Sequence, residues 1–127
     1  MIGDSATVAM VGVRPAEQVR EALDWLVLRS RDETIGPGGR GAAAAYRWAL
    51  GHPCPPPTSP AAALRPVVAA ADTARSGPPV DECRLMAEER AALAAARAEG
   101  RSTEEQDFAH GAAQALGWVL GYTHVRF

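Results

Sequence analysis

Residues 41–51 read GAAAAYRWALG, and residues 111–121 read GAAQALGWVLG. Seven of the eleven positions are identical, but the three alanine matches carry little weight in a chain this rich in alanine. The shared skeleton G-x6-W-x-L-G is more informative, because the chain contains only 3 tryptophans. The two stretches therefore predict a helical element that is used twice, which is a statement about architecture and not about chemistry.

The distance between the two copies indicates a larger repeat. The copies lie 70 residues apart, and the same offset aligns Arg14 with Arg84. At this offset each half reads as a helix, a break and a second helix that closes in W-x-L-G. One interpretation is an internal duplication of residues 14–51 as residues 84–121, which gives two helical hairpins that share one core. The alternative is that alanine-rich amphipathic helices resemble one another through composition alone.

Apolar residues at helical spacing predict an all-α fold. Ser102 and Glu105 form the S-x-x-E pattern of a capping box, and Gly51 is placed to end a helix in the left-handed conformation. No alternation of strands and helices is present, which argues against a parallel α/β sheet. We expect a short connector helix near Pro66 and four main helices, at about residues 15–31, 41–50, 82–99 and 103–120.

The length of the chain and the positions of its prolines predict how the domain is organised. A chain of 127 residues has the size of one domain, so we expect a single helical domain over residues 1–127. Residues 1–13 contain an apolar stretch, which we expect as an arm packed on the body or as a short strand. A lone strand is not stable, so it would need a partner, such as the same segment of a second chain. Residues 52–60 (HPCPPPTSP) predict a stiff, extended connector.

Charge and composition limit the kinds of partner that we expect this chain to have. The net charge is −2, and basic and acidic residues are spread over both halves of the chain. Nucleic acid is therefore not the expected partner, and a DNA-contacting regulator is only the third interpretation. The N-terminus lacks the basic region of a secretory signal, and no apolar stretch approaches the roughly 20 residues of a membrane span. We expect a cytoplasmic protein with reduced cysteines and no membrane partner.

Residues 36–41 (GPGGRG) predict a loop directly before the second helix. The amides of Gly38 and Gly39, the helix N-terminus and the Arg40 side chain could hold a phosphate or a carboxylate, with His110 nearby. The stretch lacks the Gly-Lys-Ser/Thr ending of a P-loop, and no strand precedes it. The alternative interpretation is a flexible hinge that lets the second helix fold back on the first.

The histidines and cysteines do not predict a metal site. A structural zinc site is typically built from closely spaced pairs of ligands, whereas the ligands here are scattered along the chain. Asp107 and His110 stand three residues apart, like half of a carboxylate-x-x-His motif. A di-iron site needs this motif twice, and the 70-residue offset places Pro37 and Arg40 at the corresponding positions. We therefore predict no metal and no cofactor.

Trp25 and Leu28 lie opposite the buried stripe that the first helix is expected to present. A helix with apolar residues on two sides is either wholly buried or makes a second contact. Together with Val8 and Met10 of the N-terminal arm, Trp25 and Leu28 are therefore our predicted interface residues.

The sequence contains no convergent set of catalytic residues, and this shapes the functional prediction. The leading interpretation is a non-catalytic interaction protein, such as an adaptor, a regulator or an assembly factor. Its partner would be another protein or a second copy of this chain in a homodimer. The alternative is a small helical enzyme or an anion-binding protein that uses residues 36–41.

Overall fold

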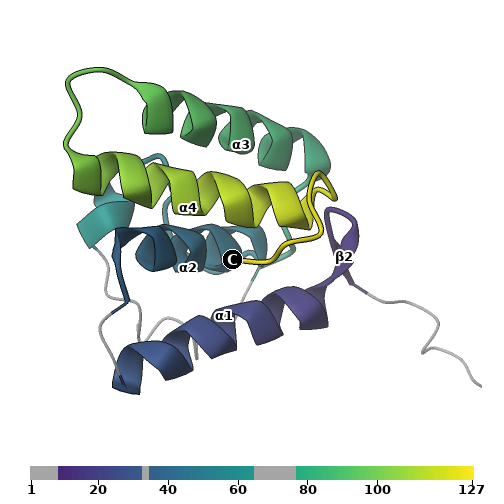
Figure 1. The fold of residues 1–127 in the computed structure, drawn as a ribbon. Coiled ribbons are helices and arrows are strands. Elements are labelled where there is room, and N and C mark those ends of the chain that lie inside the picture. Colours follow the sequence, from purple (N-terminus) through teal and green to yellow (C-terminus); the bar gives the residue numbers. More distant parts are fainter. Residues whose placement is uncertain (1–8, 33–34, 65–76) are drawn as a thin grey trace, which may run out of the picture.

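The computed structural model describes residues 9–32, 35–64 and 77–127. This part of the chain is all-α, with a small β-hairpin at its start (Figure 1). The connector helix that we predicted near Pro66 lies outside the described residues. In chain order the elements are β1 (Met10–Val11), β2 (Arg14–Pro15), α1 (Ala16–Asp32), α2 (Pro37–Ala49), the 3-10 helix η2 (Pro60–Leu64), α3 (Glu82–Arg97) and α4 (Thr103–Val119).

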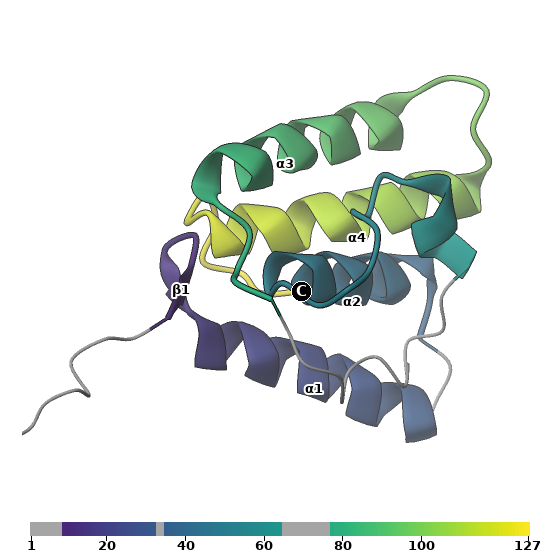
Figure 2. The same cartoon turned by 180° about the vertical axis from the view of Figure 1, so that it is seen from behind.

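Helices α2 and α4 form the middle of the molecule, as Figures 1 and 2 show from opposite sides. Helix α3 packs on α4, and α1 packs on α2 from the other side. Most of the core alanines come from α2 and α4, whose small side chains allow their backbones to lie close together. The largest fully buried side chains are Tyr46, Leu26, Leu85, Leu116, Val11, Val19 and Val119.

Two glycines define the crossing of α2 and α4. A Cβ atom at Gly41 would overlap the carbonyl oxygen of Phe108, and a Cβ atom at Gly111 would overlap the carbonyl oxygen of Gly38. Residue 108 corresponds to residue 38 at the 70-residue offset, so both glycines make the same contact in opposite directions. The crossing is therefore pseudo-symmetric, and it requires a residue without a Cβ atom on each side.

Two arginines repeat this symmetry outside the crossing. The guanidinium carbon of Arg14 lies 4.7 Å from the ring centroid of Trp118, and that of Arg84 lies 5.8 Å from the ring centroid of Trp48. Each arginine stands at the start of one half and covers the tryptophan that closes the other half. The structure thus relates the two halves by a pseudo-twofold, while their origin by duplication stays a prediction.

The helix ends follow the predicted capping chemistry. The Ser102 hydroxyl accepts a hydrogen bond from the Glu105 amide at 3.1 Å, and the Ser102 amide donates to the Glu105 carboxylate at 3.0 Å. Asp81 caps α3 through its side chain. Gly51 and Gly121 follow α2 and α4 with φ of +89° and +82°, a left-handed conformation that glycine adopts at low cost.

The N-terminal strand finds its partner within the same chain. Met10 pairs with Pro15 and Val11 with Arg14 in antiparallel register, across a turn in which Gly12 has φ of +61°. The second chain that we expected as a possible partner is therefore not required for this pairing. The Val13 amide donates to the carbonyl oxygen of Val119 at 3.0 Å, which attaches the hairpin to the end of α4.

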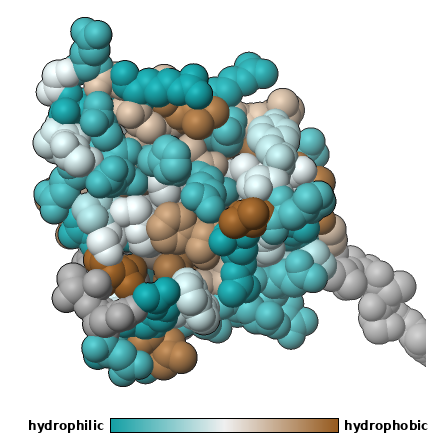
Figure 3. All heavy atoms as spheres, in the orientation of Figure 1, coloured by the Kyte–Doolittle hydropathy of each residue, from teal (hydrophilic) through white to brown (hydrophobic). Residues whose placement is uncertain are grey.

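The surface in Figure 3 is hydrophilic over most of the visible face, and its apolar residues form separate small patches. Larger apolar side chains with substantial exposure include Met10, Leu28 and Tyr122. None of the helices in residues 9–32, 35–64 and 77–127 combines the length and the hydropathy that a membrane span requires.

Candidate functional site

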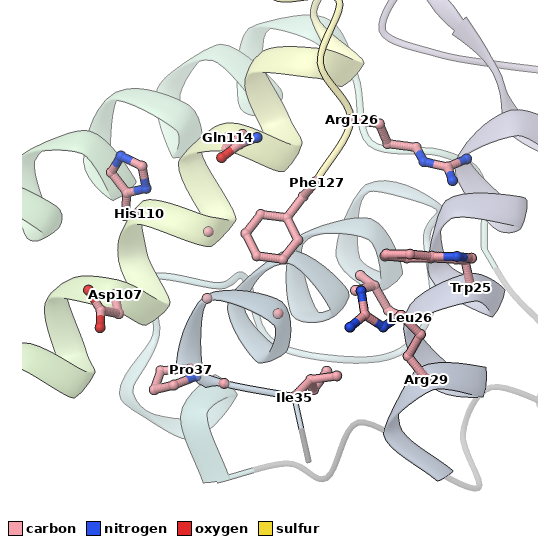
Figure 4. A pocket seen from close by; sticks show the side chains of 14 residues that line it. Trp25, Leu26, Arg29, Ile35, Pro37, Asp107, His110, Gln114, Arg126 and Phe127 are labelled. Atoms are coloured by element: carbon pink, nitrogen blue, oxygen red, sulfur yellow. The ribbon is translucent and has the colours of Figure 1, made fainter. Parts of the chain in front are cut away.

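A pocket of about 730 Å³ opens at the N-terminal end of α2 (Figure 4). One wall is formed by Trp25, Leu26 and Arg29 of α1, and the floor is formed by Ile35 and the first residues of α2. A volume of this size is typical of sites that enclose a small organic molecule, roughly 300–1,000 Å³.

The opposite wall comes from α4 and from the chain that follows it. Helix α4 contributes Asp107, His110 and Gln114, and the C-terminal segment contributes Arg126 and Phe127. This segment turns back from the end of α4 and runs toward α2, as Figure 1 shows. The pocket therefore joins two helices of the first half to the last helix of the second half.

Helix α2 begins earlier than the sequence suggested. It starts at Pro37, so Gly38, Gly39 and Arg40 belong to its first turn and not to a loop. The prediction of a loop over residues 36–41 was wrong, because proline is well suited to the first helical position. Gly36 is the N-cap residue in an extended conformation, and it has no side chain to accept from the first-turn amides.

The two glycines of this first turn are required by what packs against them. A Cβ atom at Gly38 would lie 3.2 Å from the ring of Phe127, and one at Gly39 would lie 3.1 Å from the side chain of Ile35. Both distances are shorter than ordinary van der Waals contacts. Glycine at these positions therefore lets Phe127 and Ile35 close around the start of α2.

Trp25 separates two positively charged groups. The guanidinium carbon of Arg29 lies 4.8 Å from the Trp25 ring centroid, and that of Arg126 lies 5.9 Å from it. Figure 4 shows the indole edge-on, with one arginine on each side. Stacking on an aromatic face holds a guanidinium in place.

The predicted anion-binding residues are only partly brought together. Gly38, Gly39 and His110 all line the pocket. Arg40 does not line it: its guanidinium lies 4.0 Å from the Glu104 carboxylate, along the outside of the α2–α4 contact. Arg40 therefore lies apart from Gly38 and Gly39, because the helical first turn directs residue 40 away from residues 38 and 39, and anion binding by these residues stays a prediction.

The predicted interface residues separate in space. Trp25 is 39% exposed and lines the pocket. Leu28 and Met10 are 57% and 47% exposed, and neither contributes to the pocket wall. Val8 lies outside the described residues. Trp25, which was predicted as an interface residue, thus lies in the same pocket as Gly38, Gly39 and His110, which were predicted as an anion site.

Sequence reasoning missed Arg29, Arg126 and Phe127. Arg29 follows Trp25 by four residues on the same helix, a spacing that places both side chains on one face, so this contact could have been predicted. Arg126 and Phe127 belong to the C-terminal segment that follows α4. No local signal indicated which cavity it enters, because its path depends on the separation of α1 and α4.

Tyr46 of α2 lies close to the backbone of Phe127. Its side chain is fully buried, and its hydroxyl makes no hydrogen bond of good geometry among the described residues. Burial raises the pKa of Tyr46 to about 12, while the nearby Phe127 backbone and the charge of Arg126 act in the opposite direction. Removal of solvent outweighs these two effects, so the phenol is kept neutral.

Within the described ranges, no group of three or more His, Cys, Asp or Glu side chains is arranged to hold a metal ion. The functional groups that converge in the pocket are guanidinium, indole, imidazole, carboxamide and carboxylate. No protein-family model, curated protein or solved structure matches this chain, so its function has to be argued from its own geometry.

Proposed function

We propose that this chain is a non-catalytic interaction protein that engages its partner through the pocket at the start of α2. The observation that carries the proposal is the convergence of recognition groups from four segments of the chain. Trp25 and Arg29 come from α1, the backbone amides from α2, Gln114 from α4, and Arg126 from the C-terminal segment. Such a mixture of aromatic, cationic and hydrogen-bonding groups is typical of binding surfaces.

The balance of groups in the pocket supports binding over catalysis. Among the described lining residues, the carboxylate of Asp107 and the imidazole of His110 are the candidate acid-base groups. Both are exposed on α4, where water shares the space around them. General acid-base catalysis works best with groups whose surroundings tune their protonation to the reaction, and binding makes no such demand.

Photo-cross-linking tests the proposal in the cell of origin. We expect p-benzoylphenylalanine at position 110, on the pocket wall, to give a discrete adduct with one protein. The same group at position 99, an exposed site beyond the end of α3, should give none and serves as the control. Gln114→Trp fills the pocket and should abolish the adduct at position 110. If the adduct is absent, or if it persists in Gln114→Trp, the proposal is wrong.

We also propose that the chain forms a homodimer, supported by the exposure of Leu28 and Met10. Light scattering over a wide concentration range should then give the mass of two chains. Leu28→Asp places a charge on this surface and is expected to shift the equilibrium toward the monomer. Leu64→Asp changes a still more exposed leucine on η2 and is the matched control. A single-chain mass at every concentration contradicts this part of the proposal.

A further inference from the structure

We infer that residues 122–127 form a displaceable strap over the inner part of the pocket, and that an aromatic side chain of the partner takes the place of Phe127. This inference rests on the proposed function and specifies which part of the partner enters the pocket. It also makes the C-terminal segment an internal competitor, because the partner binds fully only after the strap has left α2.

The strap is fixed at its start and weakly held beyond it. Arg14 donates a hydrogen bond to the Thr123 carbonyl oxygen at 3.1 Å. Beyond Thr123, the one hydrogen bond of the strap among the described residues is local, from the Val125 amide to the Thr123 hydroxyl at 3.1 Å. Residues 124–126 are exposed. Segments with few hydrogen bonds and little buried surface open at low free-energy cost, so the end of the strap can leave α2 while the helices stay folded.

Phe127 is the anchor of the strap. Its side chain is half-buried and packs against the core, and Figure 4 shows its ring between α2 and α4. A Cβ atom at Gly38 would lie 3.2 Å from this ring, so the glycine leaves room for an aromatic group on α2. Aromatic side chains are frequent anchors of binding surfaces, because they bury a large area in such places. The surface beside Gly38, here called the Phe127 site, thus fits an aromatic ring from either the strap or a partner.

Tyr46 indicates that the strap fills this place imperfectly. Its side chain is fully buried close to the backbone of Phe127, and its hydroxyl has no hydrogen-bond partner of good geometry among the described residues. Buried hydroxyls nearly always have a partner, and an unpaired one destabilises the contact that buries it. A partner whose backbone carbonyl accepts from the Tyr46 hydroxyl would satisfy this group, which the strap does not.

Open space adjoins the strap on the side of α1. The pocket of about 730 Å³ is lined by Phe127 and Arg126 of the strap and by Trp25 of α1. The guanidinium carbon of Arg126 lies 5.9 Å from the Trp25 ring centroid, so the strap reaches across to α1. Departure of the strap would uncover the Trp25 ring and extend the cavity toward Tyr46. A partner can therefore contact the open pocket before it displaces Phe127.

Peptides copied from the strap test the inference. Phe127→Ala in the full chain empties the Phe127 site, and the N-acetylated peptide GYTHVRF, residues 121–127, supplies the ring in trans. In NMR titrations we expect this peptide to bind Phe127→Ala and to shift the signals of the Trp25 indole and the Gly38 amide. The peptide GYTHVRA lacks the ring and should bind at least about tenfold more weakly. The original chain should also bind GYTHVRF at least about tenfold more weakly, because its own strap competes at high effective concentration.

The ionisation of Tyr46 reports whether the strap covers it. The chain contains 2 tyrosines, so Tyr46 alone titrates in the Tyr122→Phe background. Burial raises the pKa of Tyr46 to about 12. Adding Phe127→Ala should lower this pKa toward the ordinary value of 10.0, as followed by ultraviolet absorbance, while urea unfolding stays cooperative. Val125→Ala is the matched control, because Val125 belongs to the strap but is 63% exposed, and it should leave the pKa unchanged.

Several results would overturn the strap. They are equal binding of the two peptides, equal binding of GYTHVRF by Phe127→Ala and the original chain, no binding of GYTHVRF to Phe127→Ala, and an unchanged pKa of Tyr46 in Phe127→Ala. Phe127→Leu keeps an apolar side chain and serves if Phe127→Ala does not fold. It should bind GYTHVRF more tightly than the original chain does, and equal binding would again overturn the strap.

The proposed function is tested separately. The adduct at position 110 does not depend on what fills the Phe127 site, so its presence together with a failed peptide test overturns the strap alone. If the strap competes with the partner, Phe127→Ala should raise the yield of this adduct and Val125→Ala should not. A yield that falls in Phe127→Ala contradicts the competition.

Discussion

Gly111→Ala is expected to lower the free energy of unfolding by about 3–5 kcal/mol. Alanine is the better helix former by about 1 kcal/mol, so the loss must come from tertiary packing. The added Cβ atom would overlap the carbonyl oxygen of Gly38. Helices α2 and α4 must then separate, and this opens the core along their contact. Urea unfolding followed by circular dichroism measures the change.

Two further substitutions make this test specific. Gly41→Ala should cost a similar amount, because Gly41 makes the same contact with Phe108 from the other side of the pseudo-twofold. Gly117→Ala lies in the same helix as Gly111, but its Cβ atom would meet only the Thr123 side chain at 3.8 Å. It should be neutral or should stabilise by up to about 1 kcal/mol. If Gly111→Ala is as stable as the original chain, the close crossing is contradicted.

Raising the pH from 10 to 12 is expected to remove about 2 kcal/mol of stability through Tyr46 alone. The pKa of Tyr46 is raised from 10.0 to about 12 in the folded chain. In this window the unfolded chain loses the phenolic proton while the folded chain retains it, so the free energy of unfolding falls as the pH rises. The contribution is fully present below pH 10. Urea unfolding at a series of alkaline pH values measures the slope.

The composition makes this alkaline test unusually clear. The chain contains no lysine, so no ammonium side chain titrates between pH 10 and 12. Tyr46→Phe should remove most of the slope and change the stability little at pH 7, because the hydroxyl has no well-placed partner among the described residues. Tyr122→Phe changes an exposed tyrosine and should leave the slope intact. An unchanged slope in Tyr46→Phe would show that Tyr46 does not govern the alkaline loss.

The helices and their ends could be predicted from sequence because they depend on neighbours within one or two turns. The Ser102–Glu105 capping box and the left-handed Gly51 were both predicted and are present. The repeated G-x6-W-x-L-G skeleton also marked α2 and α4, which make the central contact of the fold. The error at the start of α2 came from Gly38 and Gly39, whose weak helix propensity was overridden by packing against Phe127 and Ile35.

Only part of the candidate site could be predicted from the sequence. Gly38, Gly39 and His110 were predicted for an anion site, and Trp25 was predicted for an interface, on separate grounds. Their meeting in one pocket depends on the angle between α1 and α2, which no local pattern reports. Arg40 was chosen because it is adjacent to Gly39 in sequence. The arginines that line the pocket, Arg29 and Arg126, instead come from α1 and from the C-terminal segment.

The sequence by itself determined an all-α chain, because helix periodicity, capping and glycine placement act over short distances. The tertiary structure alone decided where the halves differ. Helix α3 packs along α4, whereas α1 leaves space beside α2 that the C-terminal segment only partly fills. That difference depends on long-range packing of Trp25, Ile35 and Phe127, and it places the pocket between α1, the start of α2 and α4.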